Sequence, residues 1–215
     1  MKMIAFILIL CFSTSPVFAQ IKIGLLKYGG GGDWYANPTS LPNLVKYLNS
    51  NTEIKANPRV ETIDITSKSL YQFQFLHTTG HGNISFTESE RVILKNYLLN
   101  GGFLHIDDNY GMFPFFKKEI KKIFPDRELK EIPISHELFT SYFKFPNGLP
   151  KIHEHDGKPP VAFGIFEGKR LILLFTFECD LGDGWEDMEV HNDPPEIHEL
   201  ALKMGVNIVA FAISQ

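Results

Sequence analysis

The sequence has few cysteines and little net charge. Of its two cysteines, Cys11 lies in an N-terminal segment that we expect to be removed, so Cys179 would have no partner for an intramolecular disulfide. The net charge is −4 and the 21 basic residues are dispersed, which excludes the basic face typical of nucleic-acid-binding proteins. The densest basic stretch, residues 117–122, has helical spacing and is interpreted as a solvated helix face.

The N-terminus carries the pattern of an export leader. A single basic residue precedes an apolar run over residues 3–12, and a cleavage site with small residues at its −3 and −1 positions follows. The run is shorter than the ~20 residues of a membrane-spanning helix, which argues against an uncleaved anchor. A lipid-modified Cys11 is disfavoured because no small side chains precede it. We therefore expect a signal peptide over residues 1–19, cleavage after Ala19, and a periplasmic or secreted protein without a stable membrane span.

Strands and helices alternate along residues 20–215. Strands are predicted at residues 21–26, 60–65, 73–78, 103–106, 161–166 and 170–177, and helices at residues 41–48, 87–100, 113–124, 136–142 and 195–213. The alternation predicts a mostly parallel sheet with helices on both faces, and the turn at residues 167–169 predicts an antiparallel hairpin at one edge. The expected fold is a single α/β domain, a flavodoxin-like three-layer sandwich.

Polar segments follow four of the predicted strands, at the positions where open α/β sheets bind their ligands. Their residues are Gly29 to Gly32 with Asp33, Trp34 and Tyr35, then His81, then Asp107, Asp108 and Asn109, and finally Glu178, Cys179, Asp180, Asp183, Trp185 and Glu186. Because the carboxyl ends of parallel strands meet at one edge of a sheet, we expect these segments to converge on one rim.

The candidate ligand-binding residues combine glycines, aromatic rings and hydrogen-bonding groups. They are Gly31, Gly32, Asp33, Trp34, Tyr35, Asn109, Asp180 and Trp185. The glycines would let the backbone approach a ligand and could lead into an anion-binding helix terminus, although their spacing matches neither the Rossmann fingerprint nor the P-loop. Asp33 beside two aromatic rings suits a pocket wall. The structural alternative is a capping aspartate with two core rings.

The candidate catalytic residues are Asp107, Asp108 and His81. Adjacent carboxylates repel each other, which would raise the pKa of one of them, and His81 between two glycines is predicted to be exposed. The three residues could form an acid–base group or hold a divalent metal ion, and no other cofactor is predicted. In the structural alternative, one carboxylate caps the next helix and the other faces solvent.

The other histidines and the thiol are assigned structural roles. His105 lies inside a strand and is interpreted as a core residue, whereas residues 153–156, His-Glu-His-Asp, fit no zinc spacing and are interpreted as a solvated loop. His191 and Asp193 could reach the rim. Cys179 is interpreted as a buried thiol, and a Cys/His pair with His191 is left open.

Several motifs resemble those of a bacterial family known as domain of unknown function 4159. They are Gly-Gly-Asp-Trp-Tyr at residues 31–35, Gly80-His81-Gly82, Gly101-Gly102-Phe103 with Asp107-Asp108, residues 133–139 around His136, Gly168-Lys169-Arg170 and Gly205-Val206-Asn207-Ile208. The resemblance covers nearly all of residues 20–215. It implies a class I glutamine-amidotransferase-like, flavodoxin-like fold and no established activity. A weaker resemblance to the trehalose-utilisation ThuA-like branch of that superfamily places the nucleophile-elbow position at about Asp107 or Asp108, so the amidotransferase cysteine is absent.

Three functions are compatible with these features. The favoured one is an exported small-molecule-binding or accessory domain of the cell envelope without glutamine hydrolysis, because export separates the chain from cytosolic ATP and glutamine and the elbow cysteine is missing. The second is an exported hydrolase for carbohydrate or peptide-like material with an Asp/His acid–base or metal site. The third is a protein-interaction module of an envelope complex, which an exposed aromatic patch around Trp34, Tyr35 and Trp185 would favour.

Overall fold

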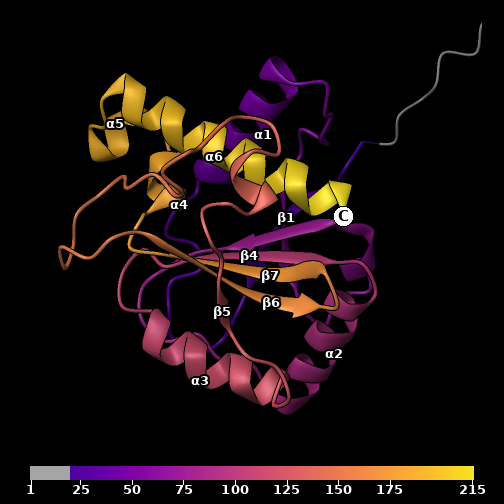
Figure 1. Cartoon of the computed structure of the whole chain (residues 1–215). Helices are drawn as coiled ribbons and strands as arrows, with labels where there is room; N and C mark the ends of the chain where they lie inside the picture. Colours follow the sequence, from indigo (N-terminus) through magenta and orange to yellow (C-terminus); the bar gives the residue numbers. More distant parts are fainter. Residues whose placement is uncertain (1–19) are drawn as a thin grey trace, which may run out of the picture.

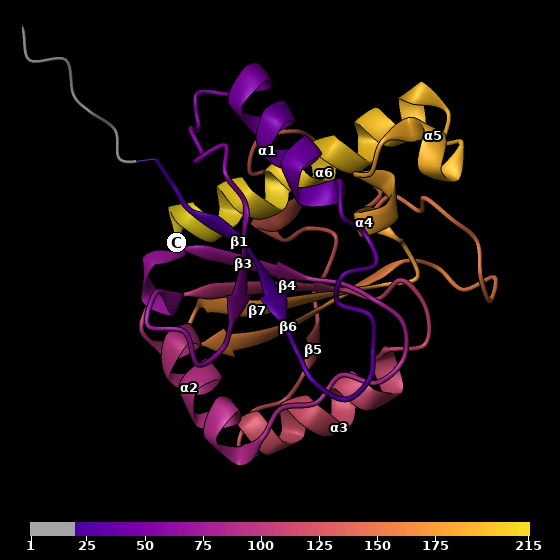
Figure 2. The ribbon, with the colours of Figure 1, turned by 180° about the vertical axis from the view of Figure 1, so that it is seen from behind.

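The computed structural model describes residues 20–215, so the signal peptide expected over residues 1–19 and its cleavage after Ala19 lie outside the described residues. Within residues 20–215 the strands form one seven-stranded sheet with the order β2-β1-β3-β4-β7-β6-β5 (Figures 1 and 2). The strands are β1 (Ile23–Lys27), β2 (Glu61–Asp64), β3 (Phe75–Thr78), β4 (Phe103–Asp107), β5 (Lys130–Glu131), β6 (Val161–Glu167) and β7 (Arg170–Phe177). Neighbours from β2 to β7 pair in parallel, whereas β6 and β5 add antiparallel pairs at one edge. The predicted α/β fold with its antiparallel edge is confirmed.

Helices cover both faces of the sheet. α1 (Ser40–Asn51) and α6 (Pro195–Ser214) lie on one face, and α2 (Glu88–Leu99) and α3 (Phe113–Ile123) lie on the other, which makes three layers (Figures 1 and 2). Short 3-10 turns form at η1 (Leu70–Gln72) and at η2 (Glu137–Phe139), the second in place of the helix predicted at residues 136–142. α4 (Leu181–Gly184) and α5 (Met188–His191) follow β7, where the sequence predicts no helix, because four-residue elements are too short to show a hydrophobic period.

Local side-chain contacts determine where α2 and α3 begin. Thr87 and Glu90 form the predicted capping box: Thr87 Oγ1 accepts from the Glu90 N–H at 3.3 Å, and Glu90 Oε2 accepts from the Thr87 N–H at 2.7 Å. The Asp108 carboxylate accepts from the N–H groups of Met112 and Phe113 at 2.8 and 2.9 Å. These contacts satisfy donors that the first turn of a helix leaves free, so the chain leaves β4 and enters α3 almost at once.

Strand side chains alternate between two apolar clusters, one on each face of the sheet. In β3, Phe75 packs on the side of α1 and α6, and Leu76 packs on the side of α2 and α3. Phe103 and Leu104 of β4 divide in the same way. This alternation buries both faces of the central strands and leaves their carboxyl ends as the place where polar groups gather.

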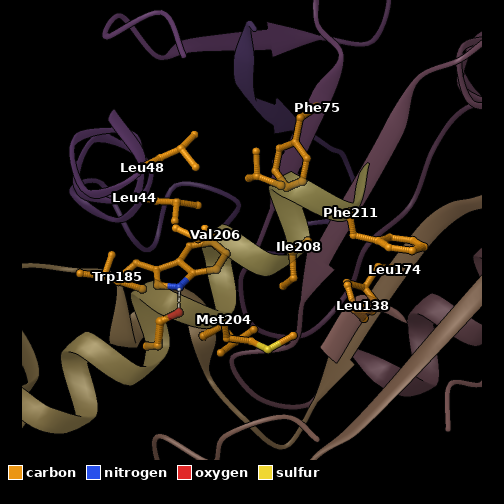
Figure 3. Packing of buried hydrophobic residues seen from close by; sticks show 14 of the residues in the cluster. Leu44, Leu48, Phe75, Leu138, Leu174, Trp185, Met204, Val206, Ile208 and Phe211 are labelled. Carbon is orange, nitrogen blue, oxygen red and sulfur yellow. Dashed lines mark hydrogen bonds between the residues drawn. The ribbon is translucent and has the colours of Figure 1, made fainter. Parts of the chain in front are cut away.

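The first cluster contains Trp185, from the segment that follows β7. Figure 3 shows its ring packed near Leu44 of α1 and Val206 of α6, and its indole N–H donates to the Ala201 carbonyl at 2.8 Å. α6 is long and apolar enough to cross a membrane by length and composition, but most of residues 201–211 are buried inside the molecule. The apolar side chains of α6 therefore pack mainly against the protein core.

Candidate functional site

Four segments converge at the carboxyl ends of β1, β3, β4 and β7, and the Asn109 side chain connects them. Its Nδ2 donates to Asn37 Oδ1 at 2.8 Å and to Asp183 Oδ1 at 2.7 Å, and its Oδ1 accepts from the Thr79 hydroxyl. These four residues follow the four strands in turn. The segments therefore meet on one rim, as expected, beside the point between β1 and β3 where the strand order reverses. Sequence reasoning missed Asn37 and Thr79, since neither residue type nor spacing marks them.

Asp107 is fully buried beneath this rim, and both of its carboxylate oxygens accept hydrogen bonds. Oδ1 accepts from the Thr176 hydroxyl, and Oδ2 accepts from the Gly182 N–H at 2.6 Å. Burial raises the pKa of Asp107 to about 8 in spite of these donors, and the neighbouring Asp180 and Asp183 add to the rise. The structure thus places Asp107 as a link between β4 and α4, away from solvent.

Asp108 caps α3, so the structural alternative is correct for this carboxylate. Burial outweighs its hydrogen bonds to the α3 backbone and raises the pKa of Asp108 to about 6. The expected rise in pKa is found for both Asp107 and Asp108, but its causes are burial and the acidic neighbours Asp180, Asp183 and Glu178 instead of mutual repulsion. The alternative in which the second carboxylate faces solvent is wrong, since Asp107 is fully buried.

His81 forms a separate and exposed pair with Asp33. His81 Nδ1 lies 3.0 Å from Asp33 Oδ2, and the His81 backbone N–H donates to Asp33 Oδ1 at 2.5 Å. Partial burial opposes ionisation of Asp33, but the hydrogen bonds from His81 prevail and lower the pKa of Asp33. Among residues 20–215 no hydrogen bond joins this pair to Asp107 or Asp108. The three predicted catalytic residues therefore do not form one hydrogen-bonded group.

The glycines after β1 pack against the loop after β3. The Gly32 N–H donates to the Asn83 carbonyl at 3.0 Å, and a Cβ at Gly32 would lie only 2.7 Å from that oxygen. Gly31 adopts a φ of 90° beside open space. Close packing of two loops and a turn therefore account for Gly32 and Gly31 without an anion.

The predicted aromatic patch is smaller than expected. Trp34 is partly buried, and Tyr35, whose ring meets it edge to face at 5.4 Å between centroids, is 64% exposed. Trp185 is fully buried in the core and does not lie on the rim. The periodic pattern could not show this, because the indole reaches α6 through tertiary packing.

Two buried carboxylates after β7 sit on strained backbone. Glu178 and Asp180 adopt the left-handed region, with φ values of 57° and 54°, which is costly for residues other than glycine. One oxygen of each, Glu178 Oε2 and Asp180 Oδ1, is buried and has no hydrogen-bond partner among residues 20–215. The nearest cation to Glu178 is Lys151, whose Nζ lies 3.5 Å from Oε2. Backbone strain and buried acceptors without donors are both typical of functional sites.

The loop before β6 brings two histidines to these carboxylates. His155 Nε2 lies 2.5 Å from Asp180 Oδ2, and His153 Nδ1 lies 3.4 Å from the same oxygen. The loop is held there by the Ile152 N–H, which donates to the Cys179 carbonyl at 2.9 Å. Residues 154–156 are exposed, as the solvated-loop interpretation predicts, but His153 is half-buried and both histidines contact Asp180, which that interpretation did not include. No local signal could have revealed this, since their partners lie in a distant part of the sequence.

His153, Asp183 and His191 form the centre of this group. His153 Nδ1 lies 3.4 Å from Asp183 Oδ2, and His191 Nε2 lies 3.9 Å from the same oxygen and 3.2 Å from Glu186. Hydrogen bonds to Asp180 and Asp183 raise the pKa of His153 to about 11. Burial opposes ionisation of Asp183, but hydrogen bonds from His153 and an asparagine lower its pKa.

The structure brings His191 and Asp193 to the rim, which the sequence left open as one possibility. Besides the contacts of His191, Asp193 Oδ1 lies 3.0 Å from His153 Nε2. Cys179, in contrast, is fully buried as predicted, and burial raises the pKa of its thiol well above the usual range. Within residues 20–215 its thiol donates one hydrogen bond, to Asp107 Oδ1 at 3.7 Å, and it forms no hydrogen bond with His191.

A cavity of about 250 Å³ lies next to this group, beyond the ends of β4 and β7. Its walls consist of aromatic rings and a few charged side chains: Asp108, Asn109, Tyr110, Gly111, Phe113, Pro114, His155, Asp156, Lys158, Phe177 and Glu178. The rings of Tyr110 and His155 lie 4.7 Å apart, and those of Phe113 and Phe177 lie 4.8 Å apart. The cavity thus combines an apolar wall of aromatic rings with the carboxylate of Glu178.

The chain belongs to the family described as Domain of unknown function (DUF4159), whose model matches residues 19–213. The family resemblance read from the motifs is therefore confirmed. A search of curated proteins found no match.

Proposed function

We propose that this DUF4159 domain is an exported small-molecule-binding domain whose ligand occupies the cavity beyond β4 and β7. The observation that carries the proposal is Glu178, which lines the cavity and whose buried Oε2 has no hydrogen bond among residues 20–215, only the Lys151 ammonium at 3.5 Å. A buried acceptor without a hydrogen bond costs about 1–3 kcal/mol, and the Lys151 ammonium offsets part of this cost. A ligand that donates a hydrogen bond to Glu178 would recover part of this cost on binding.

The cavity walls indicate the class of ligand. Phe113, Pro114 and Phe177 offer apolar surface, while Glu178 accepts hydrogen bonds and Lys158 donates them. The volume of about 250 Å³ is below the range of roughly 300–1,000 Å³ found for drug-sized ligands. These features favour a molecule of monosaccharide size with hydroxyl or amino donors on one edge and an apolar face.

Binding has more support than catalysis by the predicted acidic residues. Both oxygens of Asp107 and of Asp108 already accept hydrogen bonds within the protein, and His81 pairs with Asp33 instead. The interaction-module alternative loses one of the three aromatic rings on which it depends, because Trp185 is buried.

The proposal is tested with the purified chain and a panel of neutral sugars, amino sugars and sugar acids. Thermal shift selects candidates, and calorimetry measures their affinities. We expect at least one ligand to bind, with Glu178→Gln weakening it by about 10-fold or more, because hydrogen bonds to charged groups contribute about 1.5–3 kcal/mol. The matched control is Glu131→Gln, which removes an exposed carboxylate on β5. An affinity that is equal in both variants would contradict the proposal.

A further inference from the structure

Three side chains at the rim place ligand atoms at the separations that a small metal ion requires. The atoms offered by His153, Asp183 and His191 all lie within 4.8 Å of one another. Metal bonds of about 2.0–2.1 Å at tetrahedral angles separate ligand atoms by roughly 3.3 Å. The 3.4 Å from His153 Nδ1 to Asp183 Oδ2 agrees with this value, and the 3.9 Å from His191 Nε2 needs only a small side-chain rotation.

The surrounding side chains orient two of these ligands. Asp193 Oδ1 lies 3.0 Å from His153 Nε2, so it can hold the proton on that nitrogen and leave the Nδ1 lone pair facing Asp183. Asn37 and Asn109 both donate to Asp183 Oδ1, at 2.6 and 2.7 Å. Asp183 Oδ2 is therefore the oxygen that faces the two histidines.

The group also carries negative charge that the protein does not neutralise with lysine or arginine. Asp180, Asp183, Glu186 and Asp193 form no ion pair with either residue type anywhere in residues 20–215. Asp180 is fully buried beside His153, and its Oδ1 has no hydrogen-bond partner. Buried carboxylates are normally paired with a cation or coordinated to a metal. Asp180 Oδ2 meets His155 and His153, whereas its buried Oδ1 has no hydrogen-bond partner among residues 20–215, so the carboxylate can still interact with a cation beside His153.

We infer that His153, Asp183 and His191 bind a divalent transition metal ion of the zinc class. Two imidazoles favour zinc and its neighbours over Ca²⁺ or Mg²⁺, which prefer all-oxygen sites. Three protein ligands leave at least one position open for water or another molecule. The inference goes beyond the proposed function, since none of these three residues lines the cavity.

The test uses the full chain without a histidine tag, stripped of metal by a chelator and then titrated with ZnCl₂. Calorimetry and elemental analysis should show roughly one equivalent bound. Asp183→Asn keeps the shape of the side chain and its contacts with Asn37 and Asn109, and it should weaken binding by more than the roughly 10–100-fold expected for Asp193→Asn, which removes only an orienting partner. His191→Ala, on a four-residue helix at the surface, should act like Asp183→Asn and leave the fold intact.

The matched control is His81→Ala, which removes a histidine that also lies 3.0 Å from an aspartate but has no third ligand. It should bind zinc like the wild type. Titration with Co²⁺ gives a second readout, because coordinated imidazole changes the visible spectrum of the ion. The inference is overturned if the wild type binds no zinc, if Asp183→Asn and His191→Ala bind it equally well, or if His81→Ala loses it to the same extent.

Discussion

Two histidine pairs in this protein have opposite environments. His77 and His105 are fully buried, their Nδ1 atoms lie 3.0 Å apart, and burial lowers the pKa of both. His153 and His191 lie at the rim with ring centroids 5.2 Å apart, and carboxylates surround them. In the first pair one Nδ1 must donate and the other accept, so the two rings cannot both be protonated. The neighbours, and not the residue type, decide whether a histidine pair stays neutral or takes up a cation.

The largest effect is expected from removing the ring that covers the buried pair. The Trp185 ring lies 5.0 and 5.6 Å from those of His77 and His105. Trp185→Ala should lower the free energy of unfolding by about 3–5 kcal/mol, because it leaves a large cavity in the core. Urea unfolding measures this change. Trp34→Ala, which removes a partly buried indole, should cost clearly less, and equal losses would contradict the placement of Trp185.

The rim pair should respond to metal where the buried pair does not. If zinc binds only the folded chain, its addition at 100 times the dissociation constant should stabilise the fold by about 2.7 kcal/mol at neutral pH. Asp183→Asn should abolish this gain, whereas His77→Gln should keep it. Thermal unfolding with and without ZnCl₂ measures the difference. A gain that persists in Asp183→Asn would show that zinc acts elsewhere.

The buried pair should instead respond to acid. The pKa of His77 is lowered to about 3 in the folded state, below its ordinary value of 6.5, so the unfolded chain takes up the proton first. The contribution of neutral His77 to the free energy of unfolding is complete above pH 6.5 and is lost as the pH falls toward 3. Between pH 6.5 and 5 this histidine should account for a loss of about 2 kcal/mol. Urea unfolding of the wild type and of His77→Gln over this range should give a shallower pH dependence for the variant, and unchanged slopes would refute the assignment.

The smallest effect concerns the strained segment that lines the cavity. Glu178→Gly should remove the cost of a left-handed glutamate and stabilise the fold by about 1 kcal/mol, while it abolishes binding of the cavity ligand. Asn192 has the same backbone conformation, with φ of 58°, but asparagine tolerates it. Asn192→Gly should therefore change stability by less. Chemical unfolding tests both variants, and a destabilised Glu178→Gly chain would show that side-chain contacts outweigh the strain.

Much of the fold could be predicted because it depends on local spacing. Apolar periods placed the central strands, Thr87 and Glu90 predicted the start of α2, and the strand ends predicted a polar rim. The partners within the rim were harder to predict. The adjacency of Asp107 and Asp108 suggested one acidic pair. Instead, Asp107 is buried and accepts a hydrogen bond from the α4 backbone, whereas Asp108 caps α3.

The sequence by itself determined the alternation of elements and the concentration of polar residues after β1, β3, β4 and β7. Only the tertiary structure decided which histidines meet carboxylates. His153 reaches Asp183 because the loop before β6 pairs with the chain just after β7, through the Ile152 N–H and the Cys179 carbonyl. Hydrophobic periodicity reports which face of an element is buried, but pKa values and ligand sets depend on atoms that distant segments bring within a few ångströms.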